Sequence, residues 1–255
     1  MAKRPIVNII ILCFLICIVL YCVRRQEGFQ GGGTVDIVVA RYEEDLSWLK
    51  MFPEDFYSRI FIYNKGGEAT YDLAKSEVIP LENVGREGHT YLTHIVRNYD
   101  SLAPLTFFLP GSTATNPEKM RRVQKLREYI NTNRTSAILG YKDPQTILEA
   151  NEFSLNEWVG NSPENARKNP ESRIKSSEDR PLSKWFSSRF GGENIDCVSF
   201  LGIVVASQED IRKRPREFYE SLSEEMLHPH PETGHYVERV WKHILSIDDD
   251  KCLPV

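Results

Sequence analysis

The segment from Asn83 to His89 holds the residues whose types and spacing most suggest chemistry. Gly85 lets the backbone approach a ligand closely, because glycine has no side chain and tolerates dihedral angles that other residues avoid. Arg86 carries a planar guanidinium that can bind a phosphate or a carboxylate through two hydrogen bonds. A helix that begins here would also point unpaired backbone N–H groups at an anion. The segment therefore predicts a diphosphate or sugar site; the alternative is a turn in which Arg86 pairs with Glu87 or another carboxylate.

Polar clusters also follow three of the predicted strands. In an open parallel sheet ligands bind at the carboxyl ends of the strands, so polar clusters at successive strand ends converge on one edge. We therefore expect these clusters and the segment that opens the next helix to form one site. The candidate substrate-binding residues are Arg41, Lys65, Asn83, Gly85, Arg86, Glu87, His89, Ser112 and Arg239, and the candidate catalytic residues are Glu44, Asp45 and Glu238.

The last predicted helix contributes Glu238 and Arg239 to that set. Glu238 could take the proton from an acceptor hydroxyl group, as a general base does. The alternative is an ion pair that fixes the helix to the domain. A metal site made of His228, His230 and His235 is not predicted, because their spacing in a proline-containing loop matches no common ligand pattern.

The elements that must hold these residues alternate between strands and helices. Short apolar runs rich in β-branched residues predict buried strands, and apolar residues at spacings of three and four predict helices. Such alternation predicts an α/β fold of three layers with a mainly parallel sheet. The polar segment 150–195 is expected to be a long loop or lid that contains a helix at 182–190. The expected strands are 35–40, 59–63, 78–79, 105–109, 137–139 and 197–206, and the expected helices are 43–51, 87–99, 117–130, 207–226 and 234–245.

The N-terminal residues predict a membrane anchor. Residues 6–23 form an apolar run between basic residues, and the run is just long enough, since about 17–25 residues are needed to cross a bilayer. A cleaved signal peptide and a buried core helix are the alternatives, and the lack of a small-residue cleavage pattern favours the uncleaved anchor. The expected protein is single-pass, with its N-terminus inside and its domain lumenal or external. Its parts are a tail at 1–5, a transmembrane signal anchor at 6–23, a glycine-rich stem at 24–34, the domain at 35–247 and a second tail at 248–255.

Composition limits the classes of partner. The net charge of −4 provides no basic field for nucleic acid, so nucleic acid is not expected as a partner. Three of the five cysteines lie within the apolar run 6–23, which leaves Cys197 and Cys252 in the domain. Two cysteines are not a disulfide framework.

Six motifs stand in order along the domain: Ala40–Leu49, Ile62–Gly66, Asn83–Leu92, Asn98–Leu102, Arg214–Tyr219 and Gly234–Trp241. Together they resemble an uncharacterised domain family found in fungi, algae and large viruses, over nearly the whole domain. That family is in turn similar to GT-A glycosyltransferases. The second resemblance rests on the run from Asn83 to Glu87, which is similar to the Asn-x-Gly-Arg-Asp segment of the rhamnan-synthesis type.

The resemblance implies a fold of the nucleotide-diphospho-sugar transferase (GT-A) type. It also implies transfer of a sugar from a nucleotide-sugar donor to a glycan or glycoprotein acceptor. Such enzymes normally carry Asp-x-Asp after a central strand to hold Mn²⁺ or Mg²⁺, whereas the comparable strand here ends at Ser112 without a carboxylate. No metal ligand is therefore predicted, and Arg86 and Lys65 could neutralise phosphate instead. Mn²⁺ or Mg²⁺ that binds together with the nucleotide sugar is the alternative.

Two functions follow from these patterns. The first is a membrane-anchored glycosyltransferase, and the second is a catalytically inactive transferase-like domain that binds a carbohydrate or protein partner at the membrane. The lack of Asp-x-Asp at that strand end is the main support for the second. A hydrolase ranks last, because neither a Gly-x-Ser-x-Gly nor a His-Glu-x-x-His motif is present.

Overall fold

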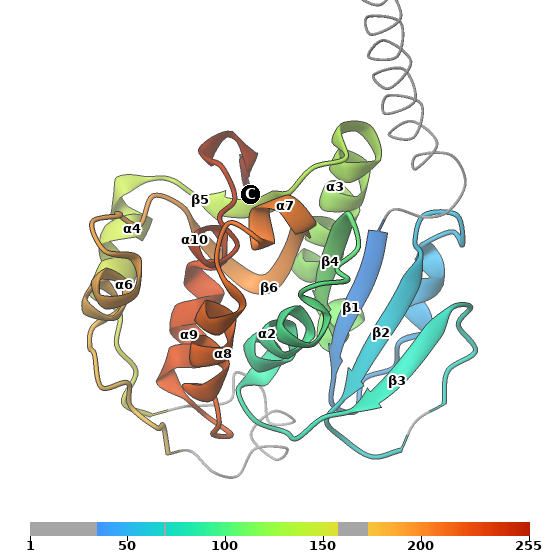
Figure 1. Cartoon of the computed structure of the whole chain (residues 1–255), viewed down its shortest axis with the longest axis horizontal. Helices are drawn as coiled ribbons and strands as arrows, with labels where there is room; N and C mark the ends of the chain where they lie inside the picture. Colours follow the sequence, from blue (N-terminus) through green and yellow to red (C-terminus); the bar gives the residue numbers. More distant parts are fainter. Residues whose placement is uncertain (1–34, 69, 158–172) are drawn as a thin grey trace, which may run out of the picture.

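The computed structural model describes residues 35–68, 70–157 and 173–255, and Figure 1 shows these as a seven-stranded sheet with helices on both faces. The strands are β1 (Val35–Arg41), β2 (Arg59–Asn64), β3 (Ser76–Pro80), β4 (Leu105–Pro110), β5 (Ala137–Tyr141), β6 (Val198–Ser207) and β7 (Cys252–Pro254). The α-helices are α2 (Arg86–Asn98), α3 (Pro117–Asn133), α4 (Pro144–Asn151), α6 (Leu182–Phe190), α7 (Gln208–Ile211), α8 (Arg216–Glu224), α9 (Glu232–Arg239) and α10 (Trp241–Ile244). The 3-10 helices are η1 (Ser47–Met51), η2 (Gly111–Thr115) and η3 (Asp249–Lys251).

The sheet is mixed, with the strand order β3-β2-β1-β4-β6-β5-β7. β1 pairs in parallel with β2 and β4, whereas β6 runs antiparallel to β4 and β5. Within the described residues, four of the six strand pairings are parallel, as expected of a mainly parallel sheet, and only the two pairings of β6 are antiparallel. Val198, the first residue of β6, pairs with Tyr141, the last residue of β5. β6 therefore begins at the edge of the sheet where β5 ends, and it runs antiparallel to both of its neighbours. A buried strand reads as one apolar run in either direction, so the pattern could not reveal this.

Each face of the sheet buries its own core. Successive side chains of a strand point to opposite faces, so Val38 of β1 packs with α2 and α9, whereas Ile37 and Val39 pack with α3. In Figure 1, α2, α8 and α9 lie in front of the sheet and α3 lies behind it. The three layers expected from the alternation of strands and helices are therefore present in the structure.

The structure corrects the prediction of a transmembrane helix and of a single-pass membrane location. Across the described residues, no helix combines the length and the apolar character that crossing a bilayer requires. The segments expected to be a tail, an anchor and a stem, 1–5, 6–23 and 24–34, lie outside the described residues, as does the stretch 158–172 of the expected loop.

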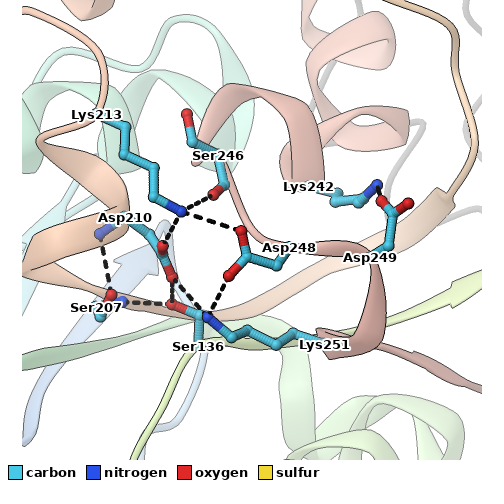
Figure 2. Close-up of polar contacts among 9 residues, drawn as sticks. All are labelled: Ser136, Ser207, Asp210, Lys213, Lys242, Ser246, Asp248, Asp249 and Lys251. Atoms are coloured by element: carbon cyan, nitrogen blue, oxygen red, sulfur yellow. Dashed lines mark hydrogen bonds and ion pairs between the residues drawn. The ribbon is translucent and has the colours of Figure 1, made fainter.

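The C-terminal residues form η3 and β7 where a tail was expected from 248, and β7 pairs in parallel with β5. Figure 2 shows the ionic network that fixes them. The ammonium of Lys213 lies 2.6 Å from Asp210 and 3.1 Å from Asp248, and Lys251 lies 2.7 Å from Asp248. Asp210 is buried and also accepts a hydrogen bond from Ser136. Asp248 therefore helps to hold the C-terminal residues in place through ion pairs, although its side chain is exposed.

The two cysteines of the domain, Cys197 and Cys252, form a disulfide that the sequence did not predict. The bridge joins the residue before β6 to β7, and β5 lies between these two strands. A methyl group built on Gly140 of β5 would lie 2.4 Å from the sulfur of Cys197, so only glycine leaves room for the bridge. The cysteines are 55 residues apart in the sequence, and their contact depends on the strand order.

Candidate functional site

The site lies at the edge of the sheet where β1, β2, β4 and β5 end. Parallel pairing places the ends of β1, β2 and β4 side by side, and β6 begins at the same edge, opposite Tyr141. The start of α2 and the last turn of α9 meet the first half of β6 there. A backbone hydrogen bond of 2.9 Å from Leu201 to the Glu238 carboxylate joins β6 to α9. The edge predicted from the polar clusters is therefore the one at which these elements converge.

The start of α2 is a sharp left-handed turn. Gly85 has φ +62° and Arg86 has φ +54°, angles at which side chains are strained and glycine is not. A methyl group on Gly85 would also lie 2.4 Å from the β-carbon of His89 and 2.8 Å from that of Met226. The glycine is therefore required both by its conformation and by its neighbours, and it sets the direction in which Arg86 leaves the chain.

Lys65, at the end of β2, holds this turn. Its ammonium donates to the carbonyl oxygens of Val84 and Arg86, each at 2.5 Å. Burial lowers the pKa of Lys65 to about 7, against the opposing effect of the Glu87 carboxylate. Lys65 was predicted to bind substrate; in the structure its hydrogen bonds go to the backbone that presents Arg86.

Glu87 and Glu238 form an interacting pair of carboxylates at the centre of the site. A kink in β6 makes room for both, because Leu201 and Gly202 have φ +76° and +62°. The N–H of Leu201 donates to Oε1 of Glu238. A methyl group on Gly202 would lie 2.9 Å from Cγ of Glu87, so this glycine allows the Glu87 side chain to pack against the strand.

The pKa values of the two carboxylates are pushed apart. Burial and the charge of Glu87 raise the pKa of Glu238, and they outweigh the opposing charges of Arg239 and Arg86. Burial also acts to raise the pKa of Glu87, but the charges of Arg86 and Lys119 prevail and the pKa is lowered. Glu87 therefore ionises first, and Glu238 keeps its proton to a higher pH. Neighbouring carboxyl groups whose pKa values are shifted in opposite directions are characteristic of acid–base sites.

Three cationic side chains, Arg86, Arg239 and Lys119, surround the pair. Nη1 of Arg86 lies 3.3 Å from Nε2 of His235. A guanidinium can only donate, so Nε2 accepts. Burial and the charge of Arg86 lower the pKa of His235 to about 3, which keeps the ring neutral. Nη1 of Arg239 donates to the carbonyl oxygen of His235 at 2.9 Å, and Lys119 donates to Ser112 at 2.7 Å. These cations supply positive charge around two carboxylates.

The sequence from residue 37 to residue 254 matches DUF3431, a family described as a protein of unknown function. The chain belongs to the DUF3431 family. This confirms the predicted membership of an uncharacterised domain family, and it carries no information about glycosyl transfer. No curated protein matches the chain.

The residues at the end of β1 and just after it make contacts that stabilise their own loop of this DUF3431 domain. Arg41 is buried and donates to Oδ1 of Asn64 at 2.6 Å, which ties the end of β1 to the end of β2. The Glu44 carboxylate accepts the N–H of Tyr42 at 2.7 Å. It also packs against Gly111, where a methyl group would lie 2.8 Å from Oε2. Arg41 was predicted to bind substrate and Glu44 to be catalytic, and the structure gives both side chains contacts within the protein.

The remaining predicted residues fall into three environments. Asp45 is exposed, and hydrogen bonds from the side chain and the N–H of Ser47 lower its pKa. Asn83 is also exposed, on the turn before α2. His89 is buried, and this burial, together with the charge of Lys65, lowers its pKa to about 4. The neutral ring of His89 thus packs beneath the turn, where it supports the site from inside.

Lys119, Leu201 and Gly202 were not predicted from the sequence. Gly202 stands in the middle of an apolar strand, and an isolated glycine there is a signal for a bulge or a close approach. Lys119 lies seven residues after Ser112, in the first turn of α3. Its position relative to the end of the preceding strand was a usable signal. Nothing in the sequence indicated the left-handed conformation of Leu201.

Proposed function

We propose that this site transfers a sugar from a nucleotide-sugar donor to a hydroxyl group of a glycan or glycoprotein acceptor, with Glu238 as the general base. The observation that carries the proposal is the carboxylate pair of Glu87 and Glu238, whose pKa values are pushed apart beside three cationic side chains. Such a transfer needs a base for the proton of the acceptor and positive charge for the departing diphosphate.

In the proposed step the acceptor oxygen bonds to the anomeric carbon of the donor while the bond from that carbon to the diphosphate breaks. The diphosphate leaves with the electron pair, and the Glu238 carboxylate takes the proton of the acceptor hydroxyl. A general base is most effective when its pKa lies near the working pH, so the raised pKa of Glu238 suits this role.

Glu87 has a supporting role in this account. Its lowered pKa keeps it ionised, and its negative charge is one of the two causes that raise the pKa of Glu238. Removing that charge would make Glu238 a weaker base. Glu87 therefore acts on the reaction through Glu238, as a positioning and tuning residue.

Positive charge in the proposed step comes from side chains. Across the described residues, no group of three or more His, Cys, Asp or Glu side chains is placed to hold a metal ion. The end of β4 offers no carboxylate for Mn²⁺ or Mg²⁺ either, because it reads Leu109-Pro110 before η2. Arg86 and Lys119 are the groups that would neutralise the charge that develops on the diphosphate.

The second candidate is a domain that binds a carbohydrate or a protein partner without catalysis. The end of β4 favours it, because the Asp-x-Asp of the similar glycosyltransferases is replaced there by residues without a carboxylate. The two candidates differ in one measurable property: a transferase also hydrolyses its donor slowly in the absence of an acceptor, whereas a binding domain leaves the donor intact.

The test is to incubate the purified full chain with a panel of nucleotide sugars, with and without Mn²⁺, and to record thermal stabilisation and donor hydrolysis. We expect one donor to stabilise the protein and to be hydrolysed. Glu238→Gln should keep the stabilisation and lower hydrolysis by about 100-fold or more, the usual contribution of a general base. Arg86→Ala should lose the stabilisation. The matched control is Arg121→Ala on α3, whose side chain is 75% exposed.

The outcomes separate the candidates. Stabilisation by a donor without hydrolysis, unchanged in Glu238→Gln, would support the binding domain over the transferase. Lack of stabilisation by every donor in the panel would contradict a nucleotide-sugar site at the start of α2.

A further inference from the structure

A row of side chains in contact with one another lies along the carboxyl edge of the sheet: Phe153, Arg239, Phe200 and Tyr141. The guanidinium carbon of Arg239 lies 3.6 Å from the centroid of the Phe153 ring and 5.2 Å from that of Phe200. The rings of Phe200 and Tyr141 have centroids 5.8 Å apart and an interplanar angle of 62°. Each residue comes from a different part of the fold, namely the residues after α4, the end of α9, β6 and the end of β5.

All four side chains of the row are partly exposed. Phe and Tyr carry large apolar surfaces whose burial is favourable, so three half-exposed rings in one row leave apolar surface in contact with water. The hydrogen bond from Nη1 of Arg239 to the carbonyl oxygen of His235 fixes the guanidinium between two of the rings. The row therefore presents a rigid surface of rings with one fixed cationic donor.

The general base stands next to this row. Glu238 precedes Arg239 in α9, and the Oε1 of Glu238 accepts the N–H of Leu201, the residue after Phe200. The closest side-chain nitrogen of Arg239 lies 4.0 Å from the Glu238 carboxylate. A molecule that packs against the exposed side of this row would thus lie beside the carboxylate.

We propose that this row is the acceptor subsite and that its ligand is a neutral sugar ring packed through its apolar face. The proposal rests on the proposed function, because it takes Glu238 as the base that faces the acceptor. A pyranose has C–H groups on one face and hydroxyl groups at its rim, so its face suits an aromatic ring and its rim suits a fixed guanidinium and a carboxylate. The ligand class is a glycan rather than a nucleotide, because in the proposed function the diphosphate of the donor meets Arg86 and Lys119.

The test uses the full chain and the methyl glycosides of glucose, galactose, mannose, xylose and rhamnose, observed by saturation-transfer NMR. Phe153→Leu removes the ring of a half-exposed residue that follows a helix and keeps an apolar side chain. We expect it to weaken glycoside binding by about tenfold, a loss equal to about 1.4 kcal/mol. Phe153→Tyr keeps the ring and should bind within about twofold of the wild type. Phe218→Leu on α8 is the matched control, since Phe218 is also half-exposed, and it should change nothing.

Donor hydrolysis without acceptor is measured in the same variants, so that the two proposals can fail separately. Glycoside binding lost in Phe153→Leu, with donor hydrolysis at the wild-type rate, supports the subsite. If the wild type hydrolyses no donor and Phe153→Leu still loses glycoside binding, the result supports the subsite and contradicts only the transferase. Equal binding by Phe153→Leu and the wild type, or lack of binding of every glycoside to the wild type, overturns the subsite.

Discussion

The ammonium of Lys65 lies 2.5 Å from the carbonyl oxygen of Arg86, and this contact joins the end of β2 to the first residue of α2. The same ammonium binds the carbonyl oxygen of Val84. It therefore spans both sides of Gly85, where the backbone adopts two consecutive left-handed residues, Gly85 and Arg86. A buried cation thus holds the turn from which the proposed phosphate-binding arginine extends.

The first prediction concerns how stability depends on pH through Lys65. Its pKa is about 7 in the folded protein and 10.5 in an ordinary environment, so the unfolded chain binds more protons between these values. The free energy of unfolding should therefore gain a contribution as pH rises from about 7 to about 10.5. Lys65→Met should lose this rise, as measured by urea unfolding across that range.

In the control Lys50→Met, which replaces a lysine whose side chain is 61% exposed, the pH dependence should stay that of the wild type. Parallel curves for wild type and Lys65→Met would contradict the burial of this ammonium.

The second prediction concerns the turn itself. Gly85→Ala places a methyl group at φ +62° and within 2.8 Å of Met226, so we expect a loss of about 2–4 kcal/mol of unfolding free energy. Gly192→Ala is the matched control, because no heavy atom lies within 4 Å of the added carbon and its φ is not left-handed. The control should stay within about 0.5 kcal/mol of the wild type. Chemical denaturation measures both, and equal stabilities would show that the turn relaxes without cost.

The third prediction concerns the disulfide of Cys197 and Cys252. Closing a loop of 55 residues should stabilise the folded chain by about 2–4 kcal/mol through the unfolded state, so the double variant to serine should lose that amount. A reducing agent should destabilise the wild type to the same level and leave the double variant unchanged. If the oxidised wild type and the double variant unfold at the same denaturant concentration, the bridge contributes nothing.

The parts of the fold that depend on nearby residues could be predicted from the sequence. The strands β1, β2 and β4 were expected within about one residue of their ends, because each is a short apolar run closed by a turn. The helix α3 begins at Pro117 as expected, with Asn116 accepting hydrogen bonds from Glu118 and Lys119. At Ser207, where the helix 207–226 was expected to begin, the side chain accepts the N–H of Asp210 and caps α7.

The parts that depend on long-range pairing could not be predicted. The direction of β6, the partner of Cys197 and the pairing of β7 with β5 all follow from the strand order, which no local pattern encodes. One error was local: Pro215, which can be read in the sequence, divides the single helix expected at 207–226 into α7 and α8, because a proline cannot continue the backbone hydrogen bonds of a helix.

The candidate site also divides into features that the sequence could predict and features that depend on long-range contacts. Arg86, Glu87, Glu238 and Arg239 were chosen for their chemical type, and the fold brings them together at one edge of the sheet. Arg41 and Asp45 were chosen on the same grounds, but their nearest partners are Asn64 and Ser47, so they stabilise loops. Chemical type cannot distinguish a charge that binds a ligand from one that binds the protein's own backbone.

The central claim is that Glu238 is a base whose pKa is raised by burial and by Glu87. The direct test is the pH dependence of kcat/KM for donor turnover in the wild type and in Glu87→Gln, a variant of similar size without the charge. In the wild type the rate should rise with pH through an apparent pKa above the ordinary value of 4.5. Removing the negative charge of Glu87 lowers the pKa of Glu238, so in Glu87→Gln the same rise should occur at lower pH. A rise at the same or a higher pH in Glu87→Gln, or a wild-type rise at or below 4.5, would contradict the account.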